Sequence, residues 1–251
     1  MAGVAGRVAL VTGAGRGIGR VTAELLLSRG ARVMAVARSE HELQTLGTDY
    51  VVADLGTEDG CNLAVKETRK HLGPVEILVC NHGIGSAHER VIWEQDAELW
   101  RETMRINLDG PYFLSRLIVK DMIEQDYGRL VFTSSTAGQV AEYAGSAYNS
   151  SKHGLLGLMR SVAQDAGAYG VTSNAVLPGW VRTPMAEKSA AAEAEERGIT
   201  TDEVWTQRAA LYPAGRVVTP EEVAEVIAFL ASEESSGVSG EAITVALGNN
   251  F

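Results

Sequence analysis

Tyr148 and Lys152 are the two residues of this sequence most readily assigned a chemical role. They lie four positions apart in a segment whose apolar residues recur every three or four positions, so a predicted helix over 148–168 puts both on one face. A phenol has a reference pKa near 10, and its use as an acid or base near neutral pH needs a shift of roughly three units, about 4 kcal/mol. A fixed lysine ammonium stabilises the phenolate. The pair indicates proton transfer, although this spacing also occurs by chance in many helices.

Polar residues elsewhere in the chain extend this pair. Ser134 and Ser135 end a predicted strand over 130–133, at a sheet edge where a hydroxyl can donate a hydrogen bond to a substrate oxygen. Asn107 lies in a predicted helical stretch over 99–123, where its amide can hold backbone or water in a proton relay. The candidate catalytic residues are Asn107, Ser135, Tyr148 and Lys152.

A glycine-rich turn follows the first predicted strand, over 8–11, and precedes a helical pattern; it reads Thr12-Gly13-Ala14-Gly15-Arg16-Gly17-Ile18-Gly19. Its glycines allow positive φ and close approach to a ligand, and the helix N-terminus offers free N–H groups to a pyrophosphate. The spacing is G-x-x-x-G-x-G rather than G-x-G-x-x-G. A glycine turn that only packs helix on strand is the alternative. The order strand, turn, helix favours a dinucleotide site, with contacts from Gly13, Gly15, Arg16, Gly17, Ile18 and Gly19.

The end of the second predicted strand, over 32–37, bears on the choice of nicotinamide cofactor. An acid there would accept hydrogen bonds from a ribose 2′-hydroxyl, whereas an arginine would pair with a 2′-phosphate. The acid is missing, and Arg38 follows Ala37. Arg16 can reach the same phosphate from the turn, unless both arginines are solvated surface charges. We predict NADP(H), with Asp54 and Leu55 beside the adenine.

The elements that must position these residues alternate between short β-branched runs and helical patterns. This alternation predicts an α/β fold: one domain over 1–251, with a Rossmann-type, doubly wound, parallel sheet of seven strands and helices on both faces. The remaining predicted strands cover 50–52, 77–80, 173–177 and 242–245.

The segment 184–213 interrupts this alternation, because it is too long for an ordinary connection between a helix and a strand. We expect an active-site lid rather than disorder. Large side chains that could line an apolar pocket, or could equally be ordinary packing, are Tyr143, Trp180, Met185 and Trp205. We interpret Glu142 as a solvated charge.

The composition excludes several classes of protein. The chain has 251 residues and a formal net charge of −10, which disfavours nucleic-acid binding. The acids gather in 184–234, with 11 acids and 4 bases, so the arginines of the N-terminal part stay available for a phosphate. No apolar run approaches the ~20 residues of a membrane span, so no membrane partner is expected and we predict a cytoplasmic protein. We interpret Cys61 and Cys80 as buried apolar residues.

Taken together, these motifs resemble the short-chain dehydrogenase/reductase family from Arg7 to about Gly248. The matching residues are the glycine turn, Asp54, Cys80-Asn81-His82-Gly83 at the family's N-N-A-G position, Asn107, Ser135, Tyr148, Lys152, Pro178-Gly179 and Thr183. The resemblance implies that Tyr148 is the general acid/base, that Lys152 lowers its pKa and orients the nicotinamide ribose, that Ser135 polarises the carbonyl, and that Asn107 completes a relay.

The same resemblance implies several further properties. It implies strand order 3-2-1-4-5-6-7, hydride delivery from nicotinamide C4, and a homodimer or homotetramer built from the helices that hold Asn107 and Tyr148. Further cofactor contacts implied by the family are Asn81, Gly83, Tyr148, Lys152, Pro178, Gly179, Val181 and Thr183.

Two departures from the family pattern stand out. Cys80 and His82 replace the usual Asn and Ala of N-N-A-G, which could put an imidazole at the substrate side. Cys80, His82 and His88 do not have the spacing of a known zinc site, so no metal is expected. Ala246-Leu247-Gly248 replaces the usual D-G-G after the last strand.

The leading hypothesis is an NADPH-dependent ketoreductase that converts a ketone, polyketide-derived or polycyclic, to a secondary alcohol. The stretches 37–40, 178–185 and 215–218 are similar to β-ketoacyl reductases and especially to bacterial aromatic-polyketide ketoreductases. The alternatives are a β-ketoacyl reductase, an NAD(P)-dependent hydroxy-acid or sugar-alcohol dehydrogenase, and a catalytically silent NADP(H)-binding protein.

Overall fold

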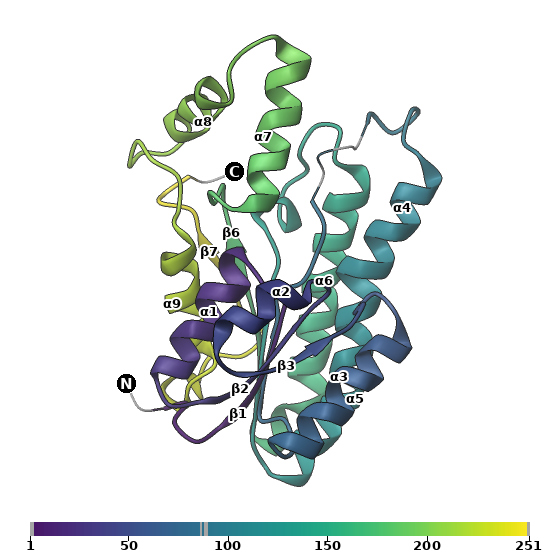
Figure 1. Ribbon diagram of the computed structural model, residues 1–251, viewed down its shortest axis with the longest axis vertical. Helices are drawn as coiled ribbons and strands as arrows, with labels where there is room; N and C mark the ends of the chain where they lie inside the picture. The colour runs from purple at the N-terminus through teal and green to yellow at the C-terminus, as the bar shows by residue number, and fades with distance from the viewer. Residues whose placement is uncertain (1–2, 86, 88–89, 250–251) are drawn as a thin grey trace.

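The protein is built on one parallel sheet of seven strands in the order β3-β2-β1-β4-β5-β6-β7 (Figure 1). The computed structural model describes residues 3–85, 87 and 90–249. The strands are β1 (Val8–Thr12), β2 (Arg32–Ala37), β3 (Asp49–Val52), β4 (Ile77–Cys80), β5 (Gly128–Thr133), β6 (Val171–Pro178) and β7 (Ala242–Val245). The predicted seven-stranded fold and the strand order implied by the family are both confirmed.

β5 and β6 begin earlier than the sequence predicts. Gly128 pairs with Val171 and Arg129 with Thr172, so the ladder starts two residues before the predicted starts at 130 and 173. Arg129 is buried within this ladder, where its guanidinium donates to the carbonyls of Ser232 and Gly170. A buried arginine is satisfied here by backbone oxygens, which hydrophobic patterning does not reveal.

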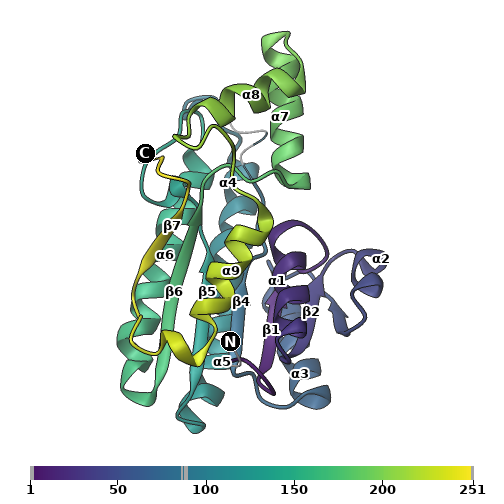
Figure 2. The same cartoon turned by 90° about the vertical axis from the view of Figure 1, so that its left-hand side faces the viewer.

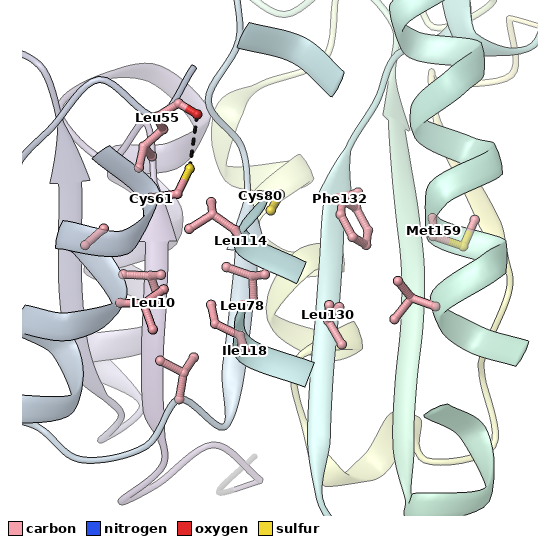
Figure 3. Close-up of a cluster of buried hydrophobic side chains, with 14 of the residues drawn as sticks. Leu10, Leu55, Cys61, Leu78, Cys80, Leu114, Ile118, Leu130, Phe132 and Met159 are labelled. Carbon is pink, nitrogen blue, oxygen red and sulfur yellow. Dashed lines mark hydrogen bonds between the residues drawn. The ribbon is translucent and has the colours of Figure 1, made fainter. Parts of the chain in front are cut away.

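One face of the sheet is covered by α3 (Glu58–His71), α5 (Gly110–Glu124) and α6 (Ser146–Ala166). Figure 3 shows the apolar layer between them and the strands. Leu114 and Ile118 of α5 pack against Leu10 and Leu78. Cys61 is buried in this layer and its Sγ lies 3.3 Å from the carbonyl oxygen of Leu55. Burial raises the pKa of this thiol to about 12, as expected for a structural cysteine.

The opposite face is covered by α1 (Gly17–Ser28) and α9 (Pro220–Leu230), which lie side by side in Figures 1 and 2. Their buried residues, such as Leu26 and Ile227, pack on Val11 and Val131. α9 begins with a capping box in which Thr219 and Glu222 bond each other's backbone N–H. Helices on both faces make the sheet doubly wound, as predicted.

The expected helix over 99–123 is interrupted. α4 (Ala97–Met104) and α5 are joined by a π-helical turn at Arg105–Asp109, so the chain stays helical while its residues shift register. Single π-turns of this kind are frequent at functional sites. This one carries Asn107.

Above the carboxyl ends of the strands stand α7 (Pro184–Arg197) and α8 (Thr201–Ala210), which form a separate layer (Figures 1 and 2). They pack on each other through Ala190, Ala194, Val204 and Trp205. The short helix α2 (Glu40–Leu43) follows β2. In the described part of the chain no helix is both long and apolar enough to cross a bilayer.

Candidate active site

A cavity of about 480 Å³ opens where the strand order reverses, at the carboxyl ends of β1 and β4. It brings together most of the residues that the sequence singles out. These are Gly13, Gly15, Arg16, Gly17, Ile18, Arg38, Asp54, Leu55, Asn81, His82, Gly83, Ser135, Tyr148, Lys152, Pro178, Gly179, Trp180, Val181, Thr183 and Met185. Four predicted site residues lie outside its lining: Gly19, Asn107, Tyr143 and Trp205.

The glycine turn has the backbone geometry that its sequence requires. Gly13 and Gly17 have φ of +63° and +56°, a region that side chains disfavour. Gly19 has a different role, because a Cβ there would lie 2.3 Å from the carbonyl oxygen of Gly13. It lets α1 pack tightly against the turn. Because α1 begins without a side-chain cap, its first backbone N–H groups remain available to an anion.

Charged side chains lie at the outer end of this turn. Arg16 and Arg38 both line the cavity, and the guanidinium of Arg16 lies 3.5 Å from the carboxylate of Glu42. Asp54 accepts from the backbone N–H of Gly56 and from Arg105. Partial burial opposes ionisation, but these bonds outweigh it and hold the pKa of Asp54 below its usual value. Asp54 is therefore ionised and oriented at neutral pH.

Lys152 is buried at the end of β5, one helical turn after Tyr148 in α6. Its Nζ donates to the carbonyl oxygen of Thr133 at 2.9 Å and lies 5.5 Å from the centroid of the Tyr148 ring. Burial lowers the pKa of this ammonium to about 8. Lys152 is therefore charged at neutral pH, close to the phenol whose ionisation it favours.

Ser134 and Ser135 have different hydrogen-bond partners. The Ser134 hydroxyl donates to the carbonyl oxygen of Lys152 at 3.2 Å, which ties β5 to α6. The Ser135 oxygen accepts from the backbone N–H of Ala137, which leaves its own proton for a carbonyl oxygen in the cavity.

Asn107 lies behind the cavity wall, in the π-turn. Its Oδ1 accepts from the backbone N–H of Ile84, and its Nδ2 donates to the Ile84 carbonyl and to Ser151. A Cβ built on Gly83 would lie 3.1 Å from Oδ1 of Asn107 and 3.7 Å from Nζ of Lys152, so the amide lies near the ammonium. The amide holds backbone, as expected; its part in a relay stays a prediction.

His82 is turned toward the interior. Its Nδ1 lies 2.8 Å from the hydroxyl of Thr12, which also accepts from the backbone N–H groups of Asn81 and His82. The residue lines the cavity, yet its Nε2 is buried, and burial lowers its pKa to about 3. The structure therefore gives His82 a neutral ring that braces the end of β1. His88 lies outside the described residues.

The aromatic residues separate into two groups. Trp180 lines the cavity and stacks on Arg208 at 3.6 Å, and Met185 lines it from α7. Trp205 does not line it, because its ring is buried between α7 and α8 and its Nε1 donates to Glu187. Tyr143 is 90% exposed. Trp205 and Tyr143 therefore do not line the cavity in this conformation, and their contact with a substrate stays a prediction.

The comparisons with known proteins agree with this geometry. A family model described as enoyl-(acyl carrier protein) reductase matches residues 13–250. The chain belongs to the short-chain dehydrogenase/reductase family. Members of this family bind a nicotinamide cofactor and catalyse oxidation or reduction, so the protein is an oxidoreductase.

Named relatives of this short-chain dehydrogenase/reductase are reductases. The chain is 33% identical to the 3-oxoacyl-[acyl-carrier-protein] reductase FabG of Escherichia coli, over 96% of each chain. It is 34% identical to a putative ketoacyl reductase of the monensin polyketide synthase from Streptomyces virginiae, over 97% of each. A structure of an actinorhodin polyketide ketoreductase variant with NADPH matches with a TM-score of 0.90 and 32% identity, over 97% of this chain and 98% of that one.

Two residues of this short-chain dehydrogenase/reductase were missed or misjudged from sequence. Glu142 lines the cavity rather than standing in open solvent. Glu42 also lines the cavity, where its carboxylate lies 3.5 Å from the guanidinium of Arg16. The sequence gives no sign of this contact. The sequence does not predict the conformation of the short segments that precede Glu142 and Glu42, so their positions could not be foreseen. Among the described residues, no three His, Cys, Asp or Glu side chains gather as a metal site.

Proposed function

We propose that the protein is an NADPH-dependent ketoreductase that reduces a ketone to a secondary alcohol. The observation that carries this proposal is the shared cavity: Ser135, Tyr148 and Lys152 line the same space as the glycine turn and its two arginines. The site also fits a dinucleotide sterically. The positive φ of Gly13 and Gly17 keeps the turn free of side chains where the cofactor backbone must approach.

The residues of the chain divide the proton chemistry between them. When bound, the cofactor supplies the hydride that reduces the carbonyl carbon. Ser135 donates a hydrogen bond to the carbonyl oxygen, and Tyr148 donates the proton that completes the alcohol. The Lys152 ammonium stabilises the phenolate left on Tyr148. Arg16 and Arg38 hold the 2′-phosphate.

A polyketide-derived or polycyclic ketone is the substrate that we propose. The cavity offers Trp180 and Met185 as apolar walls, and two similar proteins are named as a polyketide ketoreductase and as a ketoacyl reductase of a polyketide synthase. A β-ketoacyl substrate is the second candidate, supported by the similarity to FabG of Escherichia coli. We also propose a cytoplasmic homodimer or homotetramer. Trp100 of α4 and Tyr112 of α5 support this assembly because they are 37% and 48% exposed.

The test is NADPH oxidation, followed by absorbance, against β-ketoesters, quinones and polycyclic ketones. We expect turnover with at least one cyclic ketone, with much lower kcat/KM for NADH than for NADPH. Comparable constants for the two cofactors would contradict the NADPH assignment. Absence of turnover across the panel, with NADPH bound, would favour the catalytically silent alternative.

A further inference from the structure

Glu42 puts a carboxylate inside the cofactor cavity, beside the arginine assigned to the 2′-phosphate. Its Oε1 lies 3.5 Å from Nη1 of Arg16, and its side chain is 22% exposed against 51% for Arg16. Both residues line the cavity, together with Arg38 and Ser39. The charged groups at this end are therefore the guanidinium groups of Arg16 and Arg38 and the carboxylates of Glu42 and Asp54, and Glu42 is the carboxylate paired with Arg16.

Packing and backbone hydrogen bonds place Glu42 beside the glycine turn. Glu42 lies directly over the glycine turn, since a Cβ on Gly15 would be 2.6 Å from its Oε2. Its backbone carbonyl accepts from Arg20 at 3.3 Å and from the hydroxyl of Thr45 at 2.8 Å, which fixes α2 against α1. The backbone of Glu42 is thereby held against α1, and its carboxylate lies beside Gly15 and Arg16.

A 2′-phosphate and this carboxylate compete for the same guanidinium. A phosphate monoester carries about −1.5 to −2 charge at pH 7, so it must separate Glu42 from Arg16 and then lie close to a like charge. A ribose 2′-hydroxyl meets neither obstacle, because it can donate a hydrogen bond to the carboxylate. The carboxylate therefore disfavours only the phosphorylated ribose.

We propose that Glu42 is a cofactor-selectivity residue that weakens 2′-phosphate binding by competing for Arg16. The relative affinity for NADPH and NADH then depends on how far the attraction of Arg16 and Arg38 for the 2′-phosphate exceeds the competition from Glu42. This inference rests on the proposed NADPH dependence for its choice of ligand, but it concerns binding alone. Because Arg16 is half exposed, water and salt screen its interaction with Glu42, and we expect Glu42 to weaken 2′-phosphate binding only moderately.

Calorimetric titration with two cofactor fragments tests the proposal without any turnover. The probes are adenosine 2′,5′-bisphosphate and AMP, and the variants are Glu42→Gln and, as the matched control, Glu40→Gln. For Glu42→Gln we expect the Kd of the bisphosphate to fall about tenfold, equivalent to about 1.4 kcal/mol, and that of AMP to stay within about twofold. Glu40 lies on the same helix, accepts from Tyr50 and does not line the cavity, so its variant should bind both probes like the wild type.

Two further variants sharpen the result. Glu42→Asp, whose side chain is one methylene shorter, should give an intermediate gain. In an Arg16→Ala background the gain from Glu42→Gln should shrink below about threefold, because the competition is gone.

Three outcomes overturn the proposal: an unchanged or weaker bisphosphate affinity in Glu42→Gln, an equal gain for AMP, or a full gain that persists without Arg16. These titrations measure binding and not ketone reduction. A failure to reduce any ketone would contradict the proposed function but would not affect the result of the titrations.

Discussion

The strand ends and the lid segment (184–213) enclose the same cavity but are held together differently. At the strand ends, polar side chains are bonded to buried backbone: Lys152 to the Thr133 carbonyl, Ser134 to the Lys152 carbonyl, and Asn107 to Ile84. The lid segment combines one buried ion pair, Arg208 with Glu193 at 2.8 Å, with pairs that are more exposed. Arg182, which precedes the segment, and Glu187 are 2.7 Å apart with side chains 56% and 39% exposed.

This difference separates two tasks. Buried groups bonded to backbone hold a proton donor in place, whereas exposed ion pairs contribute about 0–1 kcal/mol each and exchange readily with water. The lid core is also small, made of Ala190, Ala194, Val204 and Trp205. Elements with few buried apolar contacts open at low cost in free energy. We therefore expect the strand ends to hold the groups for proton transfer, and the segment 184–213 to admit and select the substrate.

The largest effect is expected for Tyr148→Phe, which removes the proton donor of the strand-end region. Turnover should fall about 10²- to 10⁴-fold, the usual contribution of a positioned general acid. NADPH affinity should stay within about twofold, because the ring itself is kept. Steady-state rates and fluorescence titration of NADPH measure the two quantities. Wild-type turnover in this variant would refute the role of Tyr148.

A pair of truncations compares the stability of the two regions. Phe132→Ala, in fully buried β5, should lower the free energy of unfolding by about 3–5 kcal/mol. Trp205→Ala should leave global stability within about 1 kcal/mol but speed tryptic cleavage in the lid about tenfold, because only that layer loosens. Chemical denaturation and mass spectrometry of the fragments give both values. Equal losses of global stability would show that the lid is part of the main core.

The strand ends could largely be predicted from the sequence, whereas the packing within the segment 184–213 and the position of Glu42 at the cofactor rim could not. Thr12 to Gly19 and Tyr148 to Lys152 are local patterns, and local geometry decides where those residues point. For Trp205 the sequence left pocket lining and ordinary packing equally open, because a helical pattern does not reveal which neighbour covers each side chain, and the structure shows packing between α7 and α8. Glu42 was overlooked because its role depends on contact with Arg16, far away in the sequence.

His82 shows a further limit of prediction from sequence. Its type suggests a polar contact with substrate, but the ring contacts Thr12 instead. Burial then keeps the imidazole of His82 neutral. This protonation state depends on the residues packed around the ring, which the motif does not reveal. The π-turn at Asn107 escaped prediction for a similar reason, since its residues have ordinary helical patterning.

Acid sensitivity is expected to come from the strand ends. Burial lowers the pKa of His82 from 6.5 to about 3, so between these values the unfolded chain binds a proton that the folded protein does not. Stability should therefore fall as the pH drops below 6.5, by about 2 kcal/mol near pH 5 at about 1.4 kcal/mol per pH unit.

Glu187 of the lid supplies the comparison. The Arg182 guanidinium and the Trp205 N–H lower its pKa below 4.5, so it contributes little pH dependence between pH 6.5 and 5. Urea unfolding at pH 6.5 and pH 5 measures how the free energy of unfolding changes with pH. This change should be smaller than in the wild type for His82→Gln and the same as in the wild type for Glu187→Gln. The opposite pattern would place the acid sensitivity in the lid.

A smaller effect is expected at the rim between the two regions. Arg38→Ala should raise the Kd of NADPH about tenfold, because one charge-assisted contact to the 2′-phosphate is lost, and should leave NADH unchanged. Fluorescence titration of both cofactors measures this. Equal weakening of the two would show that Arg38 contacts a group they share.

The separation of catalysis from substrate selection is tested most directly by measuring kcat/KM in the variants Met185→Ala and Tyr148→Phe. The substrates are one bulky polycyclic ketone and one small β-ketoester, each with NADPH. Met185 belongs to the lid and lines the cavity. Met185→Ala should change the ratio of the two kcat/KM values by about tenfold, since about 1–3 kcal/mol of apolar contact discriminates substrates. Tyr148→Phe should lower both values by the same factor. A changed ratio in Tyr148→Phe, or an unchanged ratio in Met185→Ala, would contradict this division of tasks.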